Sequence, residues 1–188
     1  MLDQTTHVAV VRVRGLLVLS QRRLMERMAG APTVQAALAR VEPALRVAYE
    51  EASVLSWVPQ PAVRAVTREV AHAMAISPVT LAERVVSASV KELCDGPWNV
   101  LLRMVSDDAL IRRAATLFAR SFDAGELTSR ALEDGSLVLT LTGWPDVDEM
   151  DRASVAAGML ATLGAVGRSA QVEQRALPDG AIYTVRVM

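Results

Sequence analysis

The sequence predicts an α+β fold in which an N-terminal helical layer packs on a four-stranded antiparallel sheet. Three observations lead to this class. Apolar residues recur at helical spacing through the first two-thirds of the chain, the period changes to two at Asp123, and the last third reads strand, strand, helix, strand, strand. Helices and strands segregated along a chain are typical of α+β proteins. Because no repeat or flexible linker interrupts the pattern, the 188 residues are predicted to form a single domain.

The N-terminal region is predicted to begin with a short strand and to continue in helices. The strand is indicated by four β-branched residues, namely Val8, Val10, Val11 and Val13. An apolar stripe then predicts a helix over residues 15–28, ended by Gly30 and Pro32. Helical spacing returns over residues 33–49, where Pro43 either breaks the helix or opens a second one. Residues 56–61 are predicted to be a connector.

Further helices are predicted over the middle of the chain. One covers residues 63–76 and stops at Ser77-Pro78. The next is predicted to start at Thr80, with Glu83 three residues on in a capping-box arrangement. Residues 98–105 predict a short apolar helix. The helix that follows begins with the acidic residues 107 and 108, which favour the positive end of the helix dipole.

The last third contains two hairpin signals around one helix. Residues 127–133 and 137–143 flank Asp134-Gly135, a pair typical of tight hairpin turns. Three leucines at alternate positions are predicted to face the core, namely Leu137, Leu139 and Leu141. A helix is predicted from Val155 to Leu163, and the second hairpin turns at residues 178–180.

Composition excludes several classes of function. The net charge of −1 gives no general attraction to nucleic acid, and Cys94, the only cysteine, excludes a disulfide framework and a multi-cysteine zinc site. The one lysine follows Val90, so there is no P-loop, and no G-x-G pair exists for a dinucleotide. No apolar run is long enough for a membrane span, and the first six residues do not form a signal peptide. We therefore expect a cytoplasmic protein.

Three landmarks in the last third carry a resemblance to known families. They are the hairpin end Leu141-Thr142-Gly143-Trp144-Pro145, the small-residue helix Ala156-Ala157-Gly158-Met159-Leu160, and the closing strand over residues 179–186. On these, the chain resembles uncharacterised bacterial families, many of them myxobacterial paralogues, that share the fold of four-vinyl-reductase-type domains. Haem-based nitric-oxide-sensor domains and TRAPP vesicle-tethering subunits are similar in architecture. The resemblance implies a sensing, scaffold or oligomerising domain rather than an enzyme. The family commonly closes with Trp where this chain has Val187.

Few residues carry a chemical signature. His72 lies on a predicted helix, but the Tyr-x-Ser-x-Arg element that grips haem propionates in the gas-sensor relatives is absent, and His7 lies near the terminus. TRAPP-type relatives can carry an acyl chain on a buried cysteine, whereas an inert thiol is the simpler interpretation of Cys94. No nucleophile motif is present. We predict no catalytic residue, no metal and no cofactor.

Other features have a structural and a functional interpretation. The acidic residues 146, 148, 149 and 151 fail the spacing of an EF-hand loop and suit the start of a helix. The N-terminal arginines 12, 14, 22, 23 and 27 form either a solvated face or a surface for an acidic partner. Met74, Met104, Met150 and Met159 either pack the core or line an adaptable cavity. Gly158 is expected to let its helix approach the sheet closely.

The leading hypothesis is a non-enzymatic sensor that binds a small apolar ligand and acts through a protein partner. The candidate ligand-binding residues are Trp98, Leu102, Phe118 and Met159. The alternative is a constitutive scaffold without ligand, and the chain is expected to be a homodimer through its helices. An enzyme is the third possibility.

Overall fold

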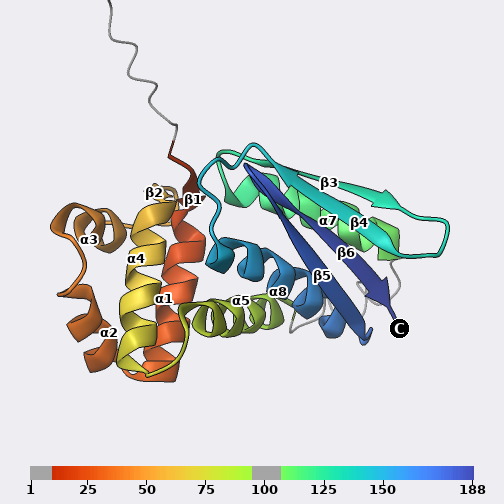
Figure 1. Cartoon of the computed structure of the whole chain (residues 1–188). Helices are drawn as coiled ribbons and strands as arrows, with labels where there is room; N and C mark the ends of the chain where they lie inside the picture. Colours follow the sequence, from red (N-terminus) through yellow and green to blue (C-terminus); the bar gives the residue numbers. More distant parts are fainter. Residues whose placement is uncertain (1–9, 95–106) are drawn as a thin grey trace, which may run out of the picture.

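The fold is the α+β class that the sequence predicts. The structure is a computed structural model that describes residues 10–94 and 107–188. Helices pack on a four-stranded antiparallel sheet, and the helical part precedes the sheet along the chain (Figure 1). The short helix predicted over residues 98–105, with Trp98 and Leu102, lies outside the described residues, as do Val8 and Met104.

The N-terminal half is a group of helices around a two-stranded ribbon. Its elements are β1 (Arg12–Arg14), α1 (Gly15–Ala29), α2 (Ala31–Leu38), α3 (Pro43–Glu50), β2 (Trp57–Pro59), α4 (Gln60–Ala73) and α5 (Pro78–Cys94). The predicted connector at residues 56–61 thus contains β2, which pairs antiparallel with β1. Three residues are too few for an alternating pattern to be visible in the sequence.

Local chemistry explains where these helices begin. Pro43 opens α3 rather than breaking a helix, and the Glu42 side chain accepts hydrogen bonds from the first free N–H groups. The prediction that Thr80 caps α5 is wrong. The helix begins at Pro78, and the Ser77 hydroxyl accepts from the Thr80 N–H at 3.0 Å.

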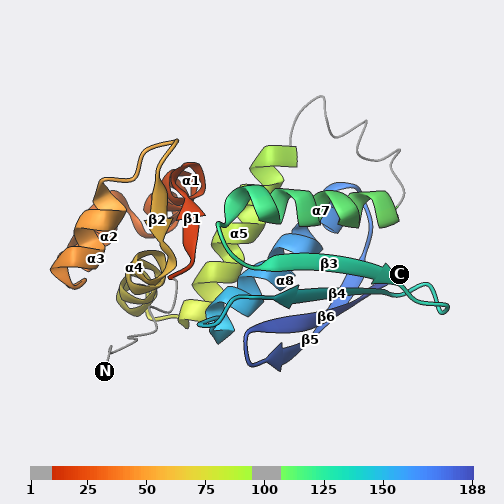
Figure 2. The ribbon, with the colours of Figure 1, turned by 90° about the horizontal axis from the view of Figure 1, so that it is seen from above.

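The C-terminal half is the sheet with its own helices. Its elements are α7 (Asp107–Ser121), β3 (Glu126–Ala131), β4 (Leu137–Thr142), α8 (Glu149–Ala165), β5 (Ala170–Leu177) and β6 (Gly180–Val187). The strand order is β3-β4-β6-β5, and both hairpins lie where they were predicted. Leu137, Leu139 and Leu141 are all buried, as predicted. Figure 2 shows α7 and α8 on the same side of this sheet.

Helix α8 starts at Glu149, earlier than the predicted start at Val155. Asp148 is its N-cap and accepts from the Asp151 N–H, while the Asp151 side chain accepts from the Asp148 N–H. This reciprocal pair is a capping box built from two aspartates. Asp148, Glu149 and Asp151 therefore stabilise the start of α8, which agrees with the predicted helix-start role of this acidic cluster.

Each half has its own cluster of buried apolar residues. The first collects side chains from β1 through α5, and the second collects side chains from α7, α8 and the sheet. Phe122, directly after α7, packs against both clusters and forms an isolated antiparallel β-bridge with Val13. The two halves therefore meet along a boundary instead of sharing one continuous core.

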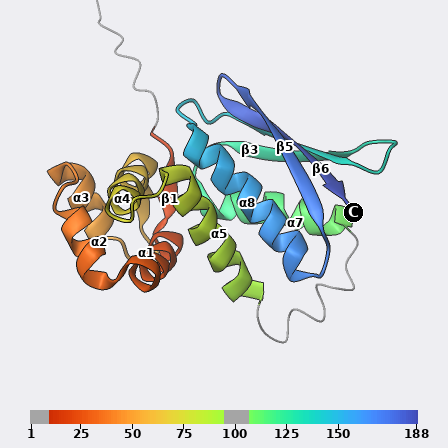
Figure 3. The ribbon, with the colours of Figure 1, turned by 60° about the horizontal axis from the view of Figure 1, so that its bottom comes forward.

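The main helical contact across this boundary joins α5 and α8. Figure 3 shows the two helices side by side, and a Cβ added at Gly158 of α8 would lie 3.6 Å from Val86 Cγ1 of α5. The expectation that Gly158 faces the sheet is wrong, because Met159 and Leu163 supply the sheet contact. Within the described ranges, none of the helices has the length and apolar character needed to cross a bilayer.

Candidate functional site

The predicted ligand-binding residues are only partly covered by the structure. Phe118 and Met159 are buried in the same C-terminal core. The Phe118 ring packs against Phe122 at 4.8 Å and Trp144 at 6.0 Å between centroids. Phe118 is thus part of an aromatic cluster within the core. Trp98 and Leu102 lie outside the described residues, so their place beside this cluster stays a prediction.

An open groove lies instead on the N-terminal half. It has a volume of about 580 Å³ and is lined by Met28 of α1, Met74 at the end of α4, and Glu83, Arg84 and Ser87 of α5. Apolar atoms dominate its lining. Methionine side chains are flexible and polarisable, so such a groove adapts to different apolar molecules. Of the other methionines considered, Met150 and Met159 are core residues.

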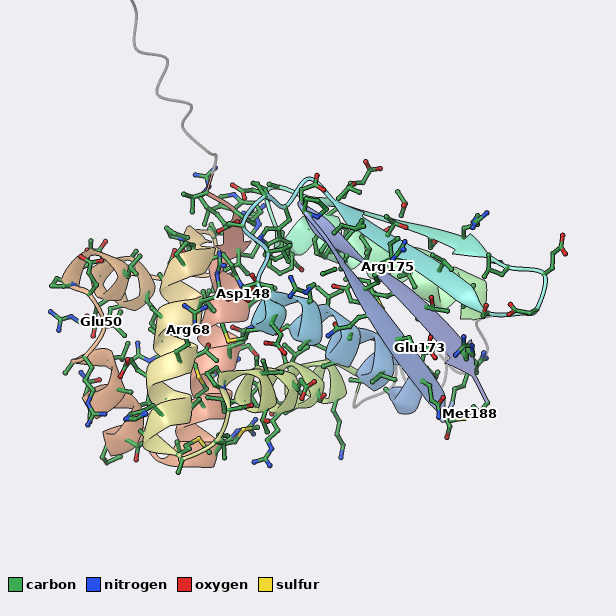
Figure 4. All side chains as sticks on the ribbon, viewed as in Figure 1. Glu50, Arg68, Asp148, Glu173, Arg175 and Met188 are labelled. Carbon is green, nitrogen blue, oxygen red and sulfur yellow. The ribbon has the colours of Figure 1, made fainter. Side chains whose placement is uncertain are left out.

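A second feature, which we call the junction, joins the two halves through charged groups. It consists of Gln60, Arg64 and Arg68 on α4, and Asp146, Asp148 and Asp151 at and before the start of α8. The three α4 residues are spaced by four, so they share one face of the helix. That face is directed at α8, as Figure 4 shows for Arg68 and Asp148.

Arg64 is the centre of the junction. Its side chain is only 9% exposed, and its Nη1 donates to the Asp146 carbonyl oxygen at 2.8 Å. Its Nη2 donates to the Asp146 carboxylate, and Nη1 lies 3.7 Å from Asp148 Oδ2 and 3.5 Å from Asp151 Oδ2. A charged group this buried is retained only when partners compensate the loss of water.

Asp151 is the most buried carboxylate of the junction, with a side chain only 2% exposed. Its Oδ1 accepts from Gln60 Nε2 at 2.7 Å, and its Oδ2 accepts from the Asp148 N–H at 3.2 Å. Burial raises the pKa of Asp151 to about 6, although Arg64 and the Gln60 hydrogen bond act in the opposite direction. The neighbouring carboxylate of Asp148 adds to the rise.

Arg68 completes the junction nearer the solvent, where its Nη2 donates to Asp148 Oδ2 at 2.6 Å. The junction therefore holds three carboxylates and two guanidinium groups, one negative charge in excess at neutral pH. Several of its buried polar atoms have no partner within the protein, namely Gln60 Oε1, Arg64 Nε and Asp146 Oδ1. Such atoms leave capacity for further hydrogen bonds.

Sequence reasoning identified one side of the junction and missed the other. The acidic residues stand out as a cluster in the sequence, but Arg64 does not, because its partners are more than eighty positions away. The signal in the sequence is the polar stripe Gln60, Arg64, Arg68, which runs at a spacing of four along a helix that also carries a buried apolar face.

The remaining candidates have ordinary surroundings. His72 is exposed at the end of α4, and Cys94 is half-buried at the end of α5. Three of the N-terminal arginines pair with carboxylates, namely Arg12 with Asp123, Arg22 with Glu26 and Arg27 with Glu92. Arg14 lies over the Trp57 ring at 4.1 Å. Among residues 10–94 and 107–188, no cluster of His, Cys, Asp or Glu has the arrangement of a metal site.

Comparison with known proteins places this fold beside H-NOX domains. The Fe(II) unliganded H-NOX protein from K. algicida superposes with a TM-score of 0.70 at 10% identity, over 93% of this chain and 96% of that one. The S. oneidensis H-NOX protein in the Fe(II)NO state gives 0.67 at 8% identity, over 93% and 99% of the two chains. A mutant H-NOX protein from T. tengcongensis gives 0.62 at 12% identity, over 93% and 96%. No family model and no curated protein sequence matches this chain. The architectural resemblance to haem-based sensor domains is thus confirmed at the level of the fold.

The part of the chain that the structure describes does not supply a histidine that fits haem. Haem iron needs an axial side chain that faces an apolar pocket, most often His. The chain has two histidines, of which His72 is exposed and His7 lies outside the described residues. The sequence also lacks Tyr-x-Ser-x-Arg, since Tyr183 is followed by Thr, Val and Arg, and Tyr49 by Glu, Glu and Ala.

Proposed function

We propose that this chain is a non-enzymatic sensor domain that binds a small apolar ligand and signals through a protein partner. The observation that carries the proposal is the position of α5. This helix forms one wall of the methionine groove and also packs along α8 in the other half. A change at the groove therefore has a direct route to the sheet half.

The groove favours an apolar ligand because apolar atoms dominate its lining, to which two methionine side chains contribute beside Glu83 and Arg84. Sensing would follow from differential affinity. A ligand that binds one packing of α5 more tightly than another shifts the population toward that packing. The neighbouring H-NOX structures support a sensor of this architecture, and the exposed position of His72 favours a ligand other than haem.

Native mass spectrometry of freshly purified protein, followed by the denatured mass of the same sample, tests the proposal. A mass that is retained natively and lost on denaturation is the expected result. The Met74→Glu variant places a charge in the groove and should lose that mass, whereas Met188→Glu, the same change at the exposed chain end, should keep it.

Three outcomes would contradict the proposal. A dimer without added mass would favour the constitutive scaffold. Turnover of a substrate that a groove substitution abolishes without unfolding the protein would favour an enzyme. An adduct that survives denaturation would direct attention to Cys94 and away from a non-covalent ligand.

A further inference from the structure

We propose that the junction is a proton-sensitive clamp, in which Asp151 takes up one proton in mildly acidic solution and thereby tightens the contact between α4 and the start of α8. This inference concerns the boundary between the halves. It does not depend on the ligand proposed above.

The surroundings of Asp151 carry the argument. From α4 it faces Gln60 and Arg64, with Arg68 one turn further on, and from its own helix and the preceding loop it faces Asp148 and Asp146. Tyr183 of β6 and Arg152 of α8 are further ionisable groups in this region, among the residues that the structure describes. Among the described residues, the buried Asp151 carboxylate has one close cation, Arg64, at 3.5 Å. Arg64 also lies near the carboxylates of Asp146 and Asp148.

The junction is already built to accept the protonated form. Asp151 Oδ2 receives the Asp148 N–H, so Oδ1, which faces Gln60, is the oxygen available for a proton. Gln60 presents its Nε2 donor to Oδ1, and its Oε1 acceptor is buried without a partner. A half-turn of the amide exchanges these two atoms, so that a protonated Oδ1 donates to Oε1. The hydrogen bond between α4 and α8 is kept, with its direction reversed.

Proton uptake also balances the charges. Asp146 stays with Arg64 and Asp148 stays with Arg68, so two carboxylates face two guanidinium groups. The excess negative charge, which burial penalises at neutral pH, is removed. Once Asp151 is neutral, Arg64 has two carboxylate neighbours, Asp146 and Asp148, instead of three.

The sign of the pH effect follows from linkage. The pKa of Asp151 is raised from 3.8 to about 6 in the folded protein, so the folded state binds this proton more tightly than the unfolded state. Stability from this group therefore increases as the pH falls from about 7 toward 4. Carboxylates with lowered pKa values behave in the opposite way.

The test compares urea unfolding of the wild type and Asp151→Asn at pH 7.5 and pH 5.0. Relative to Asp151→Asn, the unfolding equilibrium constant of the wild type should fall about tenfold between the two pH values, from a pKa that moves from 3.8 to about 6. Glu173→Gln removes an exposed carboxylate on β5 and should keep the wild-type pH profile. Amide exchange in Gln60–Ala73, corrected for its intrinsic pH dependence, should slow in acid in the wild type only.

Two results would overturn the clamp. One is an Asp151→Asn profile that parallels the wild type. The other, which needs no variant to fold, is a ¹³C titration of the wild-type Asp151 carboxyl with an inflection below pH 4.5. The expected inflection lies near pH 6 and is accompanied by a shift of the Gln60 side-chain amide.

Discussion

The two halves of the molecule are built by different means. The N-terminal core consists mainly of valines, leucines and alanines on helices, with Tyr49 as its fully buried aromatic residue among those described. The C-terminal core is organised by a hydrogen-bonded sheet and by the packed rings of Phe118, Phe122 and Trp144. Sheet register fixes which face each strand side chain of the second half occupies, whereas helices that pack through small aliphatic groups can shift. This difference is in keeping with our proposal, in which a ligand changes the packing of the helical half while the sheet half keeps its structure.

Gly180→Ala should strongly destabilise the sheet half. A Cβ at this position would lie 1.9 Å from the Leu141 carbonyl oxygen, which cannot move without disturbing the β4–β6 ladder. We expect a loss of more than about 4 kcal/mol in the free energy of unfolding. Urea unfolding measures it. Gly164→Ala, where the added Cβ meets no atom within 4 Å, is the matched control and should cost little. Equal effects of the two changes would contradict this account of the sheet.

Arg64→Met should weaken the boundary rather than either core. It removes the buried cation and leaves Asp151 and Asp146 without it, at an expected cost of about 3 kcal/mol at pH 7.5. Arg68→Met removes a cation whose side chain is 55% exposed and should cost less than about 1 kcal/mol. Chemical unfolding of both variants at the same pH gives the difference. A larger loss for Arg68→Met would show that the solvent-side pair with Asp148, not Arg64, makes the larger contribution of the junction to stability.

Gly158→Ala should slightly strengthen the contact between α5 and α8 and so raise the stability of the protein. The added Cβ would make an ordinary contact of 3.6 Å with Val86, and alanine favours a helix interior over glycine. We expect an increase of about 0.5–1 kcal/mol in the free energy of unfolding. A rise in the thermal midpoint would support it. A loss would mean that α5 and α8 are closer than this contact indicates.

The sequence was a better guide to the sheet half than to the helical half. Alternating leucines and the Asp134-Gly135 turn encode β3 and β4 locally, so the first hairpin was placed to within two residues. The predicted N-terminal strand overlaps β1, but the sequence gives no sign of β2 or of its pairing with β1, because β2 is three residues long and its partner lies more than forty positions away. The start of α8 was missed since aspartate at the third helical position is a less familiar capping partner than glutamate.

The functional features were harder to predict for the same physical reason. The sequence shows the acidic residues around α8 as a cluster. Their ion pairs, however, depend on Arg64, which reaches them because α4 packs against the loop before α8. The methionine groove combines the ends of α1 and α4 with one face of α5. Neither arrangement has a local sequence pattern, because both are made by contacts between elements.

Native-state hydrogen exchange in low concentrations of urea tests the central claim most directly. If two separately built halves meet at a boundary, the slowest amides of α1 and α4 should share one opening free energy, and those of β4 and β6 should share a higher one. The boundary amides of Asp148 and Asp151 should follow the lower value. A single opening free energy for all these amides would contradict the account, because the molecule would then open as one unit.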